Sequence, residues 1–86
     1  MYEINYTRQA LKDKDKLQYT HLYQKARELV NIIKTNPFQN PPPYEKLSGD
    51  LKGLYSRRIN RQHRIWYAVD TEQKTVRIVR MWTHYE

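Results

Sequence analysis

Residues 54–70 read LYSRRINRQHRIWYAVD, and this stretch decides the fold. Aromatic and β-branched residues recur in it, which predicts strands at about Leu54–Asn60 and His63–Asp70. The connection between them is so short that we expect two antiparallel neighbours. Side chains alternate between the two faces of a strand, so Ile65 and Tyr67 share one face, which we expect to be buried.

The flanking sequence adds two more strands and two helices. Alternation predicts a short strand over residues 2–6 and another at about Thr75–Trp82. Between these strands, a polar helix is expected from Arg8 to about Lys16, with Thr7 as its N-cap. A second helix is expected from about Thr20 to Lys34.

The second helix has the clearest periodicity in the chain. Its apolar residues form one stripe, which consists of Leu22, Ala26, Leu29, Val30 and Ile33. Asn36 precedes Pro37, and a residue before proline avoids the helical region, so the helix should end there. The first helix has few apolar side chains for packing, namely Ala10, Leu11 and Leu17. Its charged side chains are expected to be mostly solvated.

This order, β-α-α-β-β-β, predicts an α+β fold in which two N-terminal helices pack on a small, mostly antiparallel sheet. We expect residues 1–86 to form a single domain. Residues 37–53 form a loop region in which Pro41–Pro43 is stiff and extended. This segment would carry Glu45 across one end of the sheet. The two glycines, Gly49 and Gly53, signal turns.

The charge of the chain points to polyanionic partners. Its 86 residues include 16 Lys and Arg against 9 Asp and Glu, a formal net charge of +7. Such an excess attracts nucleic acid, the ribosome, an acidic protein segment or an anionic membrane; the plainer alternative is that it serves solubility alone.

Several absences narrow the class of protein. There are no cysteines, which fits a reducing cytoplasm. His21, His63 and His84 show no metal-ligand spacing, so we expect no metal and no cofactor. No apolar run approaches the ~20 residues needed to cross a bilayer, and we expect no signal peptide. The expected location is therefore cytoplasmic, with no membrane partner.

The C-terminal half holds the groups that cut RNA without a metal, which are a base, an acid and fixed cations. Glu45 is the candidate base, and His84 is the candidate acid because imidazole titrates near neutral pH. Guanidinium groups match phosphate oxygens, and the candidates are Arg57, Arg58, Arg61 and Arg64. Bases can stack on aromatic rings, and the candidates are Tyr55, Trp66, Tyr67, Trp82 and Tyr85.

Each of these groups also has an ordinary structural explanation. Glu45 could be a loop carboxylate, His84 a frayed terminal residue, and the arginines a solvated face. His63 is more typical of a turn or a strand start than of a catalytic group. The residues by themselves therefore indicate a basic α+β domain that binds RNA, and no more.

The central stretch also resembles a known family. Leu54–Ile59 and His63–Val69 resemble the SRRI…HRLVYAV core of the YoeB/Txe toxins, which belong to the RelE superfamily of bacterial toxin–antitoxin systems. Pro37-Phe38, Glu45-Lys46-Leu47 and His84-Tyr85 fit in the same order, so the resemblance covers essentially the whole chain. It implies a microbial-ribonuclease-like sheet flanked by two N-terminal helices.

The resemblance implies an endoribonuclease that enters the ribosomal A site, cleaves messenger RNA and inhibits translation. By resemblance, Glu45 is the general base and His84 the general acid. Arg64 stabilises charge at phosphorus, and Tyr85 helps to orient the substrate. The RNA-binding cations expected beside them are Arg57, Arg58, Arg61, Lys46 and Lys52.

Two positions depart from the family pattern. A family lysine three residues after the base falls on Ser48, and Lys46 or Lys52 would have to replace it. Glu86 follows the tyrosine at which relatives can end.

The family also implies partners. These are the ribosome with its messenger RNA, a second copy of the toxin, and a YefM/Axe-like antitoxin whose acidic, disordered C-terminal segment folds on the toxin. Two other functions stay open, a toxin of the same fold directed at DNA gyrase, as in the ParE branch, and a non-catalytic RNA-binding module.

Overall fold

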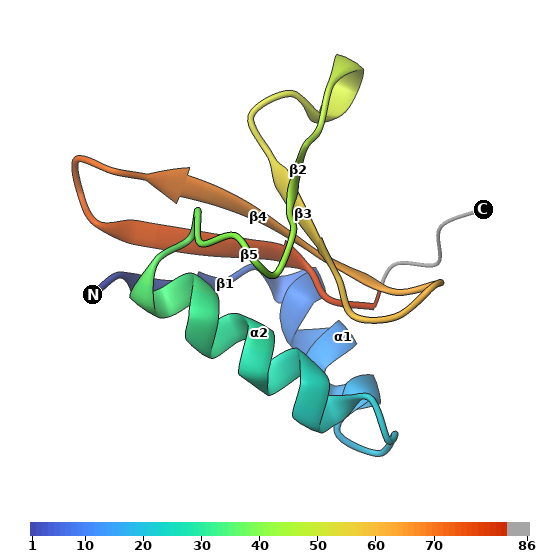
Figure 1. Ribbon diagram of the computed structural model, residues 1–86. Coiled ribbons are helices and arrows are strands. Elements are labelled where there is room, and N and C mark those ends of the chain that lie inside the picture. Colours follow the sequence, from blue (N-terminus) through green and yellow to red (C-terminus); the bar gives the residue numbers. More distant parts are fainter. Residues whose placement is uncertain (83–86) are drawn as a thin grey trace.

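The centre of the sheet is the antiparallel ladder between β3 (Tyr55–Arg58) and β4 (Arg64–Asp70). The computed structural model describes residues 1–82. On its other side β4 pairs with β5 (Thr75–Arg80), again antiparallel, and β1 (Glu3–Tyr6) pairs with β5 in parallel. The predicted strand pairs are thus confirmed, with slightly shorter strands than expected (Figure 1).

A fifth strand was not predicted. Glu45–Lys46 forms β2, a two-residue strand that pairs antiparallel with β3 and gives the sheet order β1-β5-β4-β3-β2. Two residues are too few to show alternation, so this strand has no signal in the sequence. After it, the chain makes the short turn η1 (Gly49–Leu51) and returns into β3 through Gly53, whose φ of 98° favours glycine.

The first helix, α1 (Arg8–Leu17), begins where the sequence predicted. The hydroxyl oxygen of Thr7 accepts a hydrogen bond from the backbone N–H of Ala10 at 3.1 Å, as an N-cap should. The same hydroxyl donates to the carbonyl oxygen of Val79 at 2.9 Å. The cap therefore attaches the start of α1 to β5, and it also gives a partner to one of the N–H groups in the first turn that have none within the helix.

The second helix, α2 (Tyr23–Thr35), begins three residues later than predicted. Thr20 is used in the turn between the helices instead. Its hydroxyl donates to the carbonyl of Leu17 at 2.8 Å and accepts from the N–H of Leu22 at 3.1 Å. The helix ends at Asn36, which is extended before proline as expected.

The helices cover one face of the sheet (Figure 1). The apolar stripe of α2 is confirmed, and it packs with Ile65 and Tyr67 of β4. One expectation for α1 is wrong, because Leu11 is 49% exposed rather than packed. The charged side chains of α1 are mostly solvated as expected, with one exception, Asp13, which is fully buried.

Arg57 corrects a second expectation, because its side chain lies on the covered face and is only 1% exposed. Its guanidinium donates to three backbone carbonyls of the preceding loop, those of Pro37 (3.1 Å), Gln39 (2.8 Å) and Pro42 (2.7 Å). It also donates to the Tyr67 hydroxyl at 3.2 Å, which in turn donates to Pro37 at 2.8 Å. A group enclosed in this way cannot reach RNA.

These bonds give the proline segment its shape. Pro41–Pro43 was expected to be extended, but the loop of residues 37–42 curls around the guanidinium, because three of its carbonyls converge on this one cation. The rings of Phe38, Tyr44 and Tyr55 pack against one another beside it, with centroids 5.3 to 6.0 Å apart. Tyr55 and Tyr67 are thus packing residues here rather than surfaces for bases.

Replacing Arg57 by Met should destabilise the protein by at least about 3 kcal/mol, because several buried carbonyls lose a charged donor at once. The free energy of unfolding can be measured by urea titration followed by circular dichroism. Arg58→Met, one residue along and exposed, is the control and should change stability by no more than about 0.5 kcal/mol. Equal effects of the two changes would contradict the structural role assigned to Arg57.

Candidate active site

The register of three strands places a row of side chains on the face that the helices leave open. Glu45 in β2 lies opposite Ser56 in β3, and Ser56 lies opposite Trp66 in β4. Residues directly opposite each other share a face, with Cβ atoms about 4.5–5.5 Å apart. The exposed carboxylate of Glu45 therefore belongs to this open face although it follows a loop that packs on the other one.

Two arginines lie on the same face, one step along the ladder. Arg58 and Arg64 are directly opposite each other in β3 and β4, two residues from Ser56 and Trp66. Arg58 is exposed and Arg64 half-buried. Like charges in directly opposed positions repel each other, and a bound anion relieves that repulsion. The register thus brings one carboxylate and two guanidiniums together on a surface suited to phosphate.

The other predicted cations lie in different places, some near one end of β3, one at its other end and one on the covered face. Lys46 follows Glu45 in β2, and Lys52 lies across the turn from it, so both line one hollow together with Ser48. Arg61 is exposed at the tip of the β3–β4 connection, beyond the opposite end of β3 from Lys52. Arg57, as described above, is on the covered face.

Ser56 was not singled out by the sequence. It is only 3% exposed, and among residues 1–82 neither its Oγ nor the buried Nε1 of Trp66 has a hydrogen-bond partner. Both atoms belong to the row that starts at Glu45. The sequence could have indicated Ser56 through the predicted hairpin, because the correct pairing of the two strands puts Ser56 opposite Trp66 on the same face.

The chain leaves β5 beside the start of β4. His63 is buried, and its imidazole stacks on the indole of Trp82, with ring centroids 3.9 Å apart and planes 21° apart. His63 therefore has the packing role that its place at a strand start suggested. The predicted catalytic residues His84 and Tyr85 lie outside the residues that the structure describes.

Comparison with known proteins then decides the family. A family model described as "YoeB-like toxin of bacterial type II toxin-antitoxin system" matches residues 6–85. The chain belongs to this toxin family. Among curated relatives, toxin YoeB of Escherichia coli K12 is 33% identical over 64 residues, which are 74% of each chain.

Solved structures of YoeB toxins have the same fold. A YoeB/ParE toxin from Agrobacterium tumefaciens superposes with a TM-score of 0.86 at 28% identity, over 96% of this chain and 99% of that one. The toxin in a heterotetrameric YoeB–YefM complex from Staphylococcus aureus is similar with a TM-score of 0.82 and 33% identity, over 99% of each chain. The archaeal RelE of a RelE–RelB complex, at 23% identity, shares the fold.

The described residues of this YoeB-family chain contain neither a candidate metal site nor a helix that could span a membrane. Within residues 1–82 no three His, Cys, Asp or Glu side chains are grouped so that they could hold a metal ion. Over the same residues no helix has the length and apolar character to cross a membrane.

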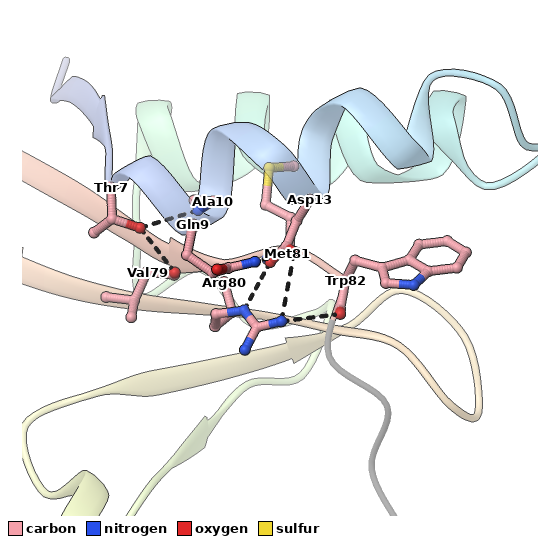
Figure 2. A network of polar contacts seen from close by, with 8 residues as sticks. All are labelled: Thr7, Gln9, Ala10, Asp13, Val79, Arg80, Met81 and Trp82. Atoms are coloured by element: carbon pink, nitrogen blue, oxygen red, sulfur yellow. Dashed lines mark hydrogen bonds and ion pairs between the residues drawn. The ribbon is translucent and has the colours of Figure 1, made fainter.

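A buried carboxylate ties α1 to the end of β5 in this toxin, as Figure 2 shows. Asp13 Oδ2 accepts from Arg80 Nε at 2.8 Å, in the only ion pair among the described residues, and from the Met81 N–H at 3.0 Å. Its Oδ1 accepts from Gln9 Nε2 at 3.2 Å. Arg80 Nη2 lies 3.5 Å from Oδ1 and 3.5 Å from the Trp82 carbonyl oxygen.

The hydrogen bonds outweigh the burial of Asp13. Burial alone raises the pKa of this carboxyl, because the charged form loses its water. Donors from Arg80, from the backbone of Met81 and Trp82 and from Gln9 favour the charged form, and the net result is a pKa below the ordinary 3.8. Asp13 therefore stays ionised in the folded protein at all neutral and mildly acid pH values.

The lowered pKa of Asp13 predicts how stability changes when the protein is unfolded at acid pH. Because the folded pKa is lower than the unfolded one, the ionised carboxylate stabilises the fold above about pH 3.8, and that contribution is lost as the pH falls through the folded value. The difference in the free energy of unfolding between wild type and Asp13→Asn should thus be constant near neutrality and shrink below about pH 4. Urea unfolding at a series of pH values measures it.

Asp15→Asn, an exposed carboxylate of the same helix, is the matched control and should show no such pH-dependent difference from wild type. A gap between wild type and Asp13→Asn that widened toward low pH would show that the carboxyl is not held in its ionised form.

Proposed function

We propose that this YoeB-family toxin is a ribosome-dependent endoribonuclease that cleaves messenger RNA by attack of the ribose 2′-hydroxyl on the adjacent phosphorus. The observation that carries the proposal is the register that puts Glu45, Arg58 and Arg64 on one open face of the sheet. These are three of the groups that such chemistry needs, and they come from three different strands.

Glu45 acts as the general base. Its carboxylate takes the proton of the 2′-hydroxyl while the 2′-oxygen bonds to phosphorus, and the bond from phosphorus to the 5′-oxygen breaks. A positioned base contributes about 10²–10⁴-fold to the rate. The exposed position of Glu45 on a short strand allows a ribose to approach it from the open side.

Arg64 and Arg58 stabilise the charge that builds up at phosphorus. The β3–β4 ladder holds their backbone positions directly opposite each other, which brings both side chains to the same part of the open face. Cations already in place lower the barrier as negative charge builds up. Lys52, which lines one hollow with Lys46 and Ser48, supplies a further cation on the projecting turn. Lys46 lies opposite Tyr55, on the other face of β2 from Glu45. Of the two, Lys52 is thus the better suited to replace the family lysine that is absent at Ser48, and Arg61 would bind RNA at the other end of β3.

His84 acts as the general acid that protonates the departing 5′-oxygen, and Tyr85 orients the substrate. Both roles are proposed from the resemblance to the family; the last described residue, Trp82, stacks on His63, the neighbour of Arg64 in sequence. Trp66, half-buried on the open face, offers a ring for base stacking.

The proposed partners follow from the same surface. A net charge of +7 attracts the ribosome and its message, and equally an acidic antitoxin segment of the YefM/Axe kind. The solved YoeB–YefM complex and the solved YoeB dimer, both from Staphylococcus aureus, support an antitoxin complex and a homodimer for this chain. The cytoplasm, where ribosomes are, is the proposed location, and residues 1–86 are proposed to act as one domain.

A second candidate function is inhibition of DNA gyrase, because the similar Agrobacterium tumefaciens protein carries the double description YoeB/ParE toxin. A gyrase inhibitor needs no base and acid at these positions. Translation and DNA supercoiling, assayed separately with the purified toxin, distinguish the two targets.

Removing the base or the acid should slow cleavage strongly while the fold is kept. We expect Glu45→Gln and His84→Ala each to slow cleavage of ribosome-bound message by about 10²–10⁴-fold, because each change removes one proton transfer. The wild-type products should carry a 5′-hydroxyl and a 2′,3′-cyclic phosphate, which end-labelling detects.

Glu28→Gln on the exposed side of α2 is the matched control and should cleave like wild type. If the double variant Glu45→Gln, His84→Ala still arrests growth at full strength, the proposed chemistry is wrong. A toxin that binds RNA with steep salt dependence but never cleaves it would instead be a non-catalytic binding module.

A further inference from the structure

We propose that Ser56 is a positioning residue for the general base. Its hydroxyl donates a hydrogen bond to one oxygen of the Glu45 carboxylate when RNA covers the open face, and so aims the other oxygen at the ribose 2′-hydroxyl. The inference rests on the proposed function of this toxin, in which Glu45 is the base. It gives a role to a buried serine that the mechanism above does not use.

The first support is that both groups are without a partner. Ser56 is only 3% exposed, yet its Oγ makes no hydrogen bond among residues 1–82. A buried hydroxyl of this kind is unusual, because it loses its bonds to water and gains none in return. Within the same residues the Glu45 carboxylate makes neither a hydrogen bond nor an ion pair. A catalytic base needs a further group that orients it, and the ladder holds one directly across from Glu45.

The second support is the register between β2 and β3. Glu45 and Ser56 are directly opposite each other, and both belong to the open face. Residues paired in this way have Cβ atoms about 4.5–5.5 Å apart. A glutamate side chain is long enough to cover that separation while both strands stay in place. The hydroxyl and the carboxylate therefore meet through side-chain rotation alone.

The third support is that the other side chains around Ser56 on this face cannot accept a hydrogen bond from it. An indole N–H and a guanidinium are donors only, and a methyl group is neither donor nor acceptor. The same-face neighbours of Ser56 along β3 and in β4 are of these kinds, namely Arg58, Arg64, Trp66 and Ala68. Among the neighbours that β2, β3 and β4 provide, all of them described, Glu45 is thus the one side-chain acceptor.

Trp66 supplies the donor on the other side of Ser56. Its Nε1 is buried and, within residues 1–82, has no hydrogen-bond partner, and the residue lies directly opposite Ser56. An indole N–H that donates to the Ser56 oxygen leaves the hydroxyl proton available for the carboxylate. Hydrogen bonds in such a chain strengthen one another. Three polar groups in one row across β4, β3 and β2 are thus ordered from donor to acceptor.

The bond between Ser56 and Glu45 forms as RNA binds, because Glu45 is exposed to water in the free protein. There its carboxylate is hydrated, and ordering the side chain costs conformational entropy. RNA on the open face excludes the water, and a hydrogen bond to a charged group is stronger in such surroundings. Catalytic hydrogen bonds often tighten only in the substrate complex.

The test measures single-turnover cleavage of messenger RNA on programmed ribosomes. We expect Ser56→Ala to lower the maximal rate about tenfold, with the half-saturating concentration of toxin changed by less than about twofold, because a misaimed base affects the chemical step and not binding. Ser56→Thr keeps the hydroxyl and should cleave within about threefold of the wild-type rate. Thr71→Ala removes a hydroxyl from the exposed turn between β4 and β5, and this control should cleave like wild type.

Two further measurements separate positioning from structural damage. In urea unfolding, the midpoint of Ser56→Ala should be no lower than that of wild type, because a buried hydroxyl without a partner costs stability. In a Glu45→Ala background, adding Ser56→Ala should change the residual rate by less than about twofold, because Ser56 acts only through that carboxylate. If the extra methyl group of Ser56→Thr prevents folding, this background decides by itself.

Wild-type speed of Ser56→Ala, a lowered unfolding midpoint, or a folded Ser56→Thr as slow as Ser56→Ala would overturn the inference and leave the proposed function intact. So would a further loss of about tenfold from Ser56→Ala in the Glu45→Ala background, because the serine would then act independently of the base. Wild-type speed of Glu45→Ala would instead remove the proposed function itself.

Discussion

The buried guanidinium of Arg57 is the contact on which the active face depends. It lies opposite Ile65 in the ladder, where an apolar side chain would be expected, and its charge is balanced by backbone carbonyls of residues 37–42. Those residues have no ladder of their own, so without the cation the carbonyls of Gln39 and Pro42 would lose their donor and that of Pro37 would keep only the Tyr67 hydroxyl. The same bonds fix the entry into β2, and hence the position of Glu45 on the far side of the sheet.

A second buried charge, that of Asp13, holds a segment in place near the other end of the chain. Asp13 binds the residues that leave β5, as Arg57 binds the residues that enter β2. Both segments lie next to proposed catalytic groups, and both lack regular hydrogen bonding. A scaffold of this size has little apolar surface with which to hold such segments. One ionised side chain that binds several polar groups at once can replace this apolar packing, because a hydrogen bond to a charged group is stronger than one between neutral groups.

The sequence predicted most of the fold, and its failures have physical reasons. The alternation in β4, the Thr7 cap and the stop before Pro37 depend on local rules, and all three are found. A two-residue strand such as β2 has no local rule. Arg57 and Arg58 look alike in the sequence, and only the pairing with Ile65 and Arg64 shows which one is buried.

Asp13 was missed although a signal was present. It lies three residues after Ala10 and four before Leu17, on the same stripe of α1 as these two buried side chains, and only its charge argued for a solvated position. For the site, register alone brings Glu45, Arg58 and Arg64 together. Buried charges are thus where sequence rules failed here, because a partner far away in the chain decides whether burial is tolerated. On the open face the corresponding rule is register, which puts Arg58 and Arg64 directly opposite each other although they are six residues apart in the chain.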